Sequence, residues 1–157
     1  MPIILTRIDD RLIHGQVTEG WGRSLKADFV LVVSDSVACD DWECDICLAA
    51  LPGNIKGEVV DVAHSPEVIN KLVGDDRSSY VLFESPEDAV CAVRGGANLR
   101  EINVGGLHSS KGKREIIDYI YVDDNDSLYL KALQNEGVEL DFRDLPDNTS
   151  VDVMAML

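Results

Sequence analysis

Short runs of β-branched residues alternate with longer helical stretches along most of this chain, and this alternation limits the folds that it can adopt. The strand-like runs cover residues 3–5, 29–33, 59–62, 80–83 and 99–104. Helical stretches begin between them, near residues 14, 40, 65 and 85. Repeated strand–helix units predict an α/β fold with a mainly parallel central sheet, right-handed crossovers and helices on both faces.

Local signals mark where several of these elements begin and end. Serine followed by proline at 65–66 and again at 85–86 indicates two helix starts. Serine caps a helix well, and proline fits the first helical position. The breaker pair at 52–53 ends the second helix. Gly137 is expected to be the C-cap of a late helix.

The rhythm of the sequence changes after residue 104. A strand is predicted at 116–122 without a helix before it, followed by a helix at 125–136 and a last strand at 138–143. This part leaves room for an antiparallel edge strand near the C-terminus. A chain of 157 residues suits one domain with its own core. We therefore expect a single domain over residues 1–157.

The charge balance and the hydropathy exclude some classes of partner. The chain has 14 basic and 29 acidic side chains, for a net charge of −15, whereas a protein that binds nucleic acid needs a basic surface. No apolar run approaches the roughly 20 residues that span a bilayer, and the N-terminus lacks the pattern of a signal peptide. We therefore expect a cytoplasmic protein that binds no nucleic acid.

The run RIDDRLIHGQV at residues 7–17 places a dense group of polar side chains directly after an apolar strand. Loops of this kind carry the chemistry of many α/β domains. His14 lies where the loop meets the next helix, and free backbone N–H groups at a helix start favour an anion. Because neutral imidazole is a nucleophile near neutral pH, we predict that His14 carries a phosphoryl group.

Neighbours of His14 suit the same task. The planar guanidinium of Arg11 is suited to hold phosphoryl oxygens through two parallel hydrogen bonds. Either Asp9 or Asp10 is placed to accept a hydrogen bond from the second ring nitrogen and so fix the tautomer. The sequence alone does not choose between these two carboxylates.

A second basic segment follows the fifth predicted strand. Residues 103–114 contain three basic side chains and no acidic one. If the first and fifth strands are neighbours, the loops at 7–16 and 105–113 meet at one sheet edge and can close over one anion. Gly105 and Gly106 would allow a ligand to approach the backbone closely; the alternative is an ordinary strand-ending turn.

Other candidate sites are weaker. His64 is expected to be a loop residue without chemistry, and His108 either contacts the same anion or is solvated. The spacing of Cys39, Cys44 and Cys47 matches that of plant-type iron–sulfur ferredoxins, but a helix is expected there rather than a wrapping loop. Buried free thiols are the favoured interpretation for these three residues and for the fourth cysteine, Cys91. The segment at 106–113 fails as a nucleotide phosphate loop because its glycine spacing is wrong.

The run at residues 7–17 closely resembles the active-site segment of the enzyme IIB components of the mannose/fructose/sorbose class of the bacterial phosphotransferase system. The resemblance covers nearly the whole chain. Further similar stretches are 32–38, 82–88, 102–107, 137–138 and 143–146. Ser34 stands where the family commonly has asparagine, and Leu107, followed by His108, replaces a frequent methionine.

The resemblance implies a IIB phosphotransferase domain associated peripherally with a membrane permease. His14 would accept phosphate on Nδ1 from a phosphohistidine of a IIA domain and pass it to a sugar that enters through the IIC/IID components. No metal, nucleotide or other cofactor is implied. The residues assigned to phosphate binding or its support are Arg11, Arg7, Asp9, Asp10, Gln16, Gly105 and Gly106.

Two other functions remain open at this point. One is a regulatory protein that keeps the IIB fold and reports phosphorylation state without transport. The other is a nucleotide-binding module, which would need the phosphate loop that this chain lacks. The sequence names neither the sugar nor the oligomeric state, and it assigns no role to the cysteine group at 39–47.

Overall fold

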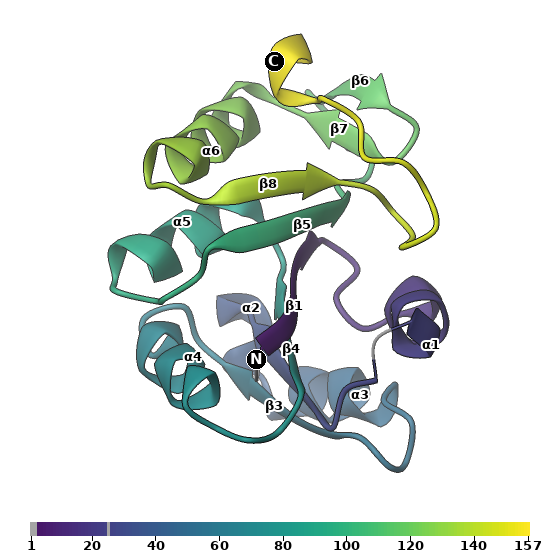
Figure 1. Cartoon of the computed structure of the whole chain (residues 1–157), viewed down its shortest axis with the longest axis vertical. Helices are drawn as coiled ribbons and strands as arrows, with labels where there is room; N and C mark the ends of the chain where they lie inside the picture. Colours follow the sequence, from purple (N-terminus) through teal and green to yellow (C-terminus); the bar gives the residue numbers. More distant parts are fainter. Residues whose placement is uncertain (1–2, 25) are drawn as a thin grey trace.

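The computed structural model describes residues 3–24 and 26–157, without the side chains of Gln16 and Arg23. Within this part of the chain, six parallel strands form a central sheet in the order β3-β2-β4-β1-β5-β8 (Figure 1). The predicted α/β class with a mainly parallel sheet is therefore confirmed. The strands are β1 (Ile3–Asp9), β2 (Phe29–Val33), β3 (Lys56–Val60), β4 (Ser79–Phe83), β5 (Glu101–Gly106) and β8 (Glu139–Phe142).

Helices cover both faces of this sheet, as expected. One face carries α4 (Ser65–Val73), α5 (Pro86–Arg94) and α6 (Asp124–Asn135), and the other carries the π-helical turn η1 (Gln16–Trp21), α1 (Gly22–Ser24), α2 (Asp35–Ala38) and α3 (Asp41–Ala49) (Figure 1). Successive strand residues point to opposite faces. Leu31 therefore packs in the core beneath α4, α5 and α6, whereas Val30 and Val32 pack in the core beneath η1 and α3.

Side-chain caps explain several of the helix starts. Asp40 accepts hydrogen bonds from the backbone N–H groups of Trp42 and Glu43 at the start of α3. Ser85 caps α5 in the same way, as predicted. The start of α4 lies one residue earlier than expected, because His64 holds the cap position and Ser65 is already helical. None of the described helices has the length and apolar character needed to cross a membrane.

Three sequence predictions about strands need correction. β1 continues to Asp9 rather than ending at Leu5, so Arg7 and Asp9 are strand residues and not loop residues. The strand predicted at 116–122 is a hairpin of β6 (Arg114–Ile117) and β7 (Ile120–Val122). The antiparallel pairing lies in this separate hairpin, whereas the edge strand β8 is parallel to β5. The remaining element is the 3-10 turn η2 (Met154–Met156) near the C-terminus.

Candidate phosphoryl-carrier site

The site lies at the carboxyl edge of the central sheet, where β1 and β5 end side by side. Arg7 of β1 pairs in register with Asn103 of β5, and Asp9 pairs with Gly106. The two strands are therefore neighbours, which the expectation of one shared anion site required. His14 follows β1 after a short turn, and its carbonyl accepts hydrogen bonds from the N–H groups of Val17 and Thr18 at the start of η1.

Asp9 is the centre of this site. Its carboxylate is fully buried and accepts hydrogen bonds from three cationic or potentially cationic side chains. Arg7 Nη2 lies 2.9 Å from Oδ2, and His14 Nε2 lies 2.8 Å from the same oxygen. Arg11 donates to Oδ1 from its backbone nitrogen at 3.0 Å and from Nε at 3.3 Å. Asp9, rather than Asp10, is thus the carboxylate that holds the second ring nitrogen of His14.

The ionisation of Asp9 follows from these contacts. Burial by itself would raise the pKa of the Asp9 carboxyl, but the hydrogen bond from His14 and the charge of Arg7 outweigh burial and hold that pKa well below its usual value. Burial also lowers the pKa of Arg7, while Asp9 acts in the opposite direction. The pair therefore provides an anchor beneath His14 that is ionised at neutral pH.

Arg7 is held from several sides. Its side chain has no exposed surface. Nη1 donates to Asn103 Oδ1 at 2.8 Å and to the carbonyl oxygen of Asp144 at 2.9 Å. The guanidinium carbon also lies 5.8 Å from the centre of the Trp21 ring, within the range of a cation–π interaction. Arg7 is therefore enclosed by protein groups, and its guanidinium contacts Asp9, Asn103 and Asp144.

The paired glycines at the end of β5 make room for this buried ion pair. A Cβ atom at Gly105 would lie 1.9 Å from Arg7 Cζ, and a Cβ atom at Gly106 would lie 2.9 Å from Asp9 Cγ. Their side-chain-free surfaces are therefore filled by Arg7 and Asp9. The close approach that the sequence predicted exists, but it is made by these two side chains.

The tautomer of His14 follows from its contact with Asp9. An ionised carboxylate only accepts hydrogen bonds, so Nε2 must carry the proton and the neutral ring has its lone pair on Nδ1. The His14 side chain is 16% exposed and that of Arg11 is 39% exposed. Leu12 adopts a left-handed conformation with φ of 56° between them, a strain that is often found in functional loops.

Asp10 and His108 form a second contact between the two loops. The backbone N–H of His108 donates to Asp10 Oδ2 at 2.7 Å, and the Nδ1 atom of His108 contacts the other oxygen. Asp10 N also donates to the carbonyl oxygen of Gly106 at 3.1 Å. Asp10 therefore fixes the loop that follows β5. Asp9, Asp10 and His108 each offer a potential metal ligand atom within 4.8 Å of the other two, but the oxygens of Asp9 already accept hydrogen bonds from Arg7, Arg11 and His14.

Two basic residues of the second segment, Lys113 and Arg114, pair with acidic residues away from the site. Lys113 pairs with Asp126 at 3.1 Å, and Arg114 pairs with Asp124 at 3.3 Å. Both carboxylates belong to the first turn of α6, where negative charge is favourable. The expectation that the two basic segments close over one anion is therefore not met by Lys113 and Arg114. The side chain of Gln16 lies outside the described part of the structure.

The remaining candidates lie away from His14. His64 is exposed and pairs with Asp61 at 2.7 Å. Cys44 and Cys47 are half-buried on the inner face of α3, whereas Cys39 and Cys91 are exposed. The expectation of buried thiols is thus wrong for Cys39 and Cys91. Among the described residues, the cysteines do not bring three ligand atoms together.

Sequence reasoning missed two side chains that complete the site. Asn103 accepts from Arg7, and its Nδ2 donates to the carbonyl oxygens of Asp141 and Arg143 at 3.2 and 3.0 Å. Trp21 Nε1 donates to the carbonyl oxygen of Asp144 at 2.9 Å. An asparagine between Ile102 and Val104 in an apolar strand was a visible signal, since a buried amide needs partners.

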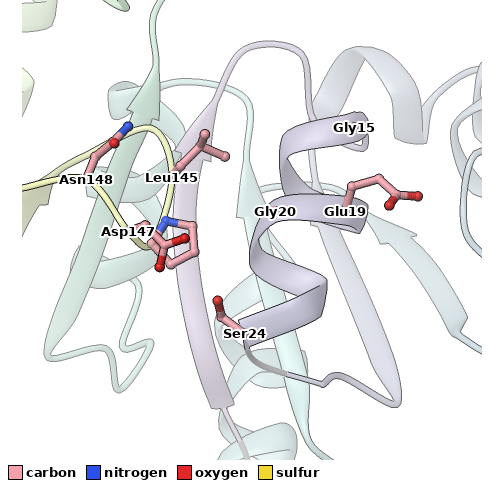
Figure 2. A pocket seen from close by; sticks show the side chains of 8 residues that line it. Gly15, Glu19, Gly20, Ser24, Leu145, Asp147 and Asn148 are labelled. Carbon is pink, nitrogen blue, oxygen red and sulfur yellow. The ribbon is translucent and has the colours of Figure 1, made fainter.

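A hollow with a volume of about 750 Å³ lies beside the start of η1. Figure 2 shows Gly15, Glu19 and Ser24 on the helical side and Leu145, Asp147 and Asn148 on the loop after β8. Leu145 Cδ2 would lie 2.6 Å from a Cβ atom at Gly20. The helix that follows His14 therefore packs directly against that loop.

Comparison with known proteins shows that the sequence is similar to one family over nearly its whole length. A family model described as "PTS system sorbose subfamily IIB component" matches residues 3–157. A sorbose-specific EIIB component of Lacticaseibacillus casei is 35% identical over 157 residues, which cover 100% of this chain and 96% of that protein. A fructose-specific EIIB component of Bacillus subtilis (strain 168) is 33% identical over 157 residues, with the same shares covered.

A solved structure shows the same architecture. The IIBSor domain of the sorbose permease from Klebsiella pneumoniae superimposes with a TM-score of 0.89 at 32% sequence identity. The match covers 99% of this chain and 95% of that one. The similarity in sequence and the similarity in structure therefore both extend over almost the whole chain.

Proposed function

Because the chain belongs to the sorbose subfamily of IIB components of the phosphotransferase system, we propose that His14 is its phosphoryl carrier. The observation that supports this most directly is the bond from His14 Nε2 to the buried Asp9 carboxylate at 2.8 Å. That bond fixes one tautomer, with the nucleophilic lone pair on Nδ1.

The first transfer, from the donor to His14, needs no added acid or base. The Nδ1 lone pair of His14 attacks the phosphorus of a phosphohistidine on the IIA donor and forms a new P–N bond. The donor P–N bond breaks, and its electron pair returns to the donor ring. The proton stays on His14 Nε2, hydrogen-bonded to Asp9, and the Asp9 carboxylate stabilises the ring as positive charge develops on it. Positioning and charge compensation therefore do most of the work.

Arg11 is the residue that we assign to the phosphoryl oxygens. Its guanidinium lies beside His14 on Asp9 and is partly exposed, whereas that of Arg7 is enclosed. In the second step a sugar hydroxyl attacks the phosphorus, the P–N bond to His14 breaks, and the electron pair returns to Nδ1. The hydroxyl proton leaves to water or to a base on the permease. No nucleotide, metal or other cofactor takes part in either step.

The test is phosphate transfer from a phosphorylated IIA donor to the purified protein and to a His14→Ala variant, followed by treatment with acid. We expect acid-labile label on the wild type and none on His14→Ala. The His64→Ala variant is a matched control, since His64 is exposed and pairs with the nearby Asp61, and it should be labelled like the wild type. Equal labelling of His14→Ala would place the carrier elsewhere and refute the mechanism.

The proposed partners are a IIA donor domain, a IIC/IID permease and its sugar, with the protein acting at the cytoplasmic face of the membrane. A regulatory IIB-like protein would show the same labelling. Transfer of the label to a sugar in vesicles that contain the permease separates these two functions, because only the transport component passes phosphate on.

A further inference from the structure

The helix α3 is apolar on its outer side as well as on its inner side. Trp42 and Ile46 lie one helical turn apart and are 71% and 52% exposed. Cys44 and Cys47 face inward against the core, and α3 has no fully buried residue. An outer apolar side of this kind, opposite the side that packs on the core, is normally covered by another surface. We call the outer side, formed by Trp42 and Ile46, the Trp42–Ile46 surface.

Acidic residues surround this surface. Asp41, Glu43 and Asp45 alternate with the apolar residues of α3, and the cap residue Asp40 precedes them. All four are exposed, and α3 itself contains no basic residue. An apolar centre with a charged rim is the usual arrangement of a protein–protein interface. The rim in this case carries negative charge, so the matching surface must be positive.

The Trp42–Ile46 surface starts at the same edge of the sheet as His14. α3 follows β2 through the single turn of α2, so its first turn lies near the carboxyl end of β2. β2 is parallel to β4, and β4 is parallel to β1, so the carboxyl ends of all three strands share one edge. The residues of η1 and α3 also pack on the same face of the sheet (Figure 1). A partner that reaches His14 therefore approaches the edge where α3 begins.

We infer that the Trp42–Ile46 surface docks on the cytoplasmic loops of the membrane permease that receives the phosphoryl group. The inference rests on the proposed function and adds the docking surface to it. Cytoplasmic loops of membrane proteins carry an excess of lysine and arginine, which complements the acidic rim and the net charge of −15. A bare membrane surface does not fit, because anionic lipids repel such a rim.

The expected size of the effect follows from the kind of residue. A tryptophan that becomes buried in an interface is among the residues whose truncation weakens binding most. Trp42→Ala should therefore raise the KM for the phosphorylated protein at the permease by about 10-fold or more. The value of kcat at saturation should not change, since neither Trp42 nor Ile46 touches the reacting atoms.

The experiment measures two steps and one binding equilibrium. The first step is labelling of His14 by a phosphorylated IIA donor without membranes. The second is transfer from the labelled protein to sugar in inverted vesicles that contain the permease. Binding of the unlabelled protein is measured by sedimentation with the same vesicles and with vesicles that lack the permease. Variants are Trp42→Ala and Ile46→Ala, and Leu128→Ala is the matched control, because Leu128 is 63% exposed on α6 across the sheet.

For Trp42→Ala and Ile46→Ala we expect unchanged labelling, an increased KM in the second step and weaker binding to permease vesicles. Leu128→Ala should match the wild type in all three measurements. Glu43→Lys should weaken the same binding, and added salt should weaken that of the wild type. Unchanged binding of Trp42→Ala, equal binding to permease-free vesicles, or a loss confined to labelling by IIA would each overturn it. Failure of the wild type to be labelled would refute the proposed function instead, while the sedimentation result would still decide the docking.

Discussion

Replacing Gly105 by alanine tests how the buried ion pair is accommodated. The new Cβ atom would lie 1.9 Å from Arg7 Cζ, whereas real Cβ contacts below 3.0 Å are essentially never seen. The guanidinium must therefore move. It cannot do so freely, because Nη1 and Nη2 are held at 2.8 to 2.9 Å by Asn103, the Asp144 carbonyl and Asp9.

The cost follows from these contacts. Breaking a buried ion pair typically costs about 3–5 kcal/mol, because the remaining charge stays buried without full compensation. We expect Gly105→Ala to lose about this much free energy of unfolding, measured by urea denaturation at pH 7. In the absence of a clash, alanine would stabilise a strand slightly relative to glycine. The sign of the effect thus depends on Arg7.

Two controls isolate the cause. Gly53→Ala introduces a Cβ atom with no neighbour within 4 Å, so its stability should change by less than about 0.5 kcal/mol. In an Arg7→Met background the clash with the guanidinium is absent, and Gly105→Ala should cost less than about 1 kcal/mol. A loss below about 1 kcal/mol in the wild-type background, or an equal loss in both backgrounds, would refute the reasoning.

Three further predictions concern ionisation and loop contacts. The Asp9→Asn variant should lose about 3 kcal/mol of free energy of unfolding at pH 7. Because the folded-state pKa of Asp9 is depressed, its contribution is present above the unfolded pKa of about 4 and declines as the pH falls below it. Asp88→Asn should be more stable than the wild type at pH 8, because burial raises the pKa of Asp88 to about 6. As the pH rises from 4 to 6, the wild type should lose about 1 kcal/mol of free energy of unfolding through Asp88, once partial exposure is considered. His108→Ala should lose about 1 kcal/mol through the contact with Asp10, and His108→Asn should restore part of it.

Urea unfolding across pH 3 to 8 checks all three of these predictions. An Asp9→Asn deficit that persists undiminished at pH 3 would contradict the assigned ion pair. A constant difference between Asp88→Asn and the wild type over the whole range would show that Asp88 does not titrate as described. If His108→Asn is no more stable than His108→Ala, then the side-chain bond to Asp10 contributes little.

The sequence predicted the fold class because the alternation of apolar runs and capped helices is a local property of the chain. It also predicts roles for His14 and Arg11, since their residue types and their position after a strand suit phosphoryl transfer. The strand limits were less accurate. Charged residues ended the first predicted strand at Leu5, yet β1 continues to Asp9 because Arg7 and Asp9 neutralise each other in the interior.

The choice between Asp9 and Asp10 depended on tertiary structure. Only the pairing of β1 with β5 shows that Asp9, the last residue of β1, lies against Gly106 beneath His14, while Asp10 in the following turn contacts His108. The partners of Lys113 and Arg114 were equally hidden from the sequence, because the carboxylates that bind them come from a helix that follows a hairpin. Local patterns thus indicated which elements form, and they predict His14 as the phosphoryl carrier. Only the packing of strands distant in sequence decided which charges meet, because an ion pair depends on distances that a linear pattern does not contain.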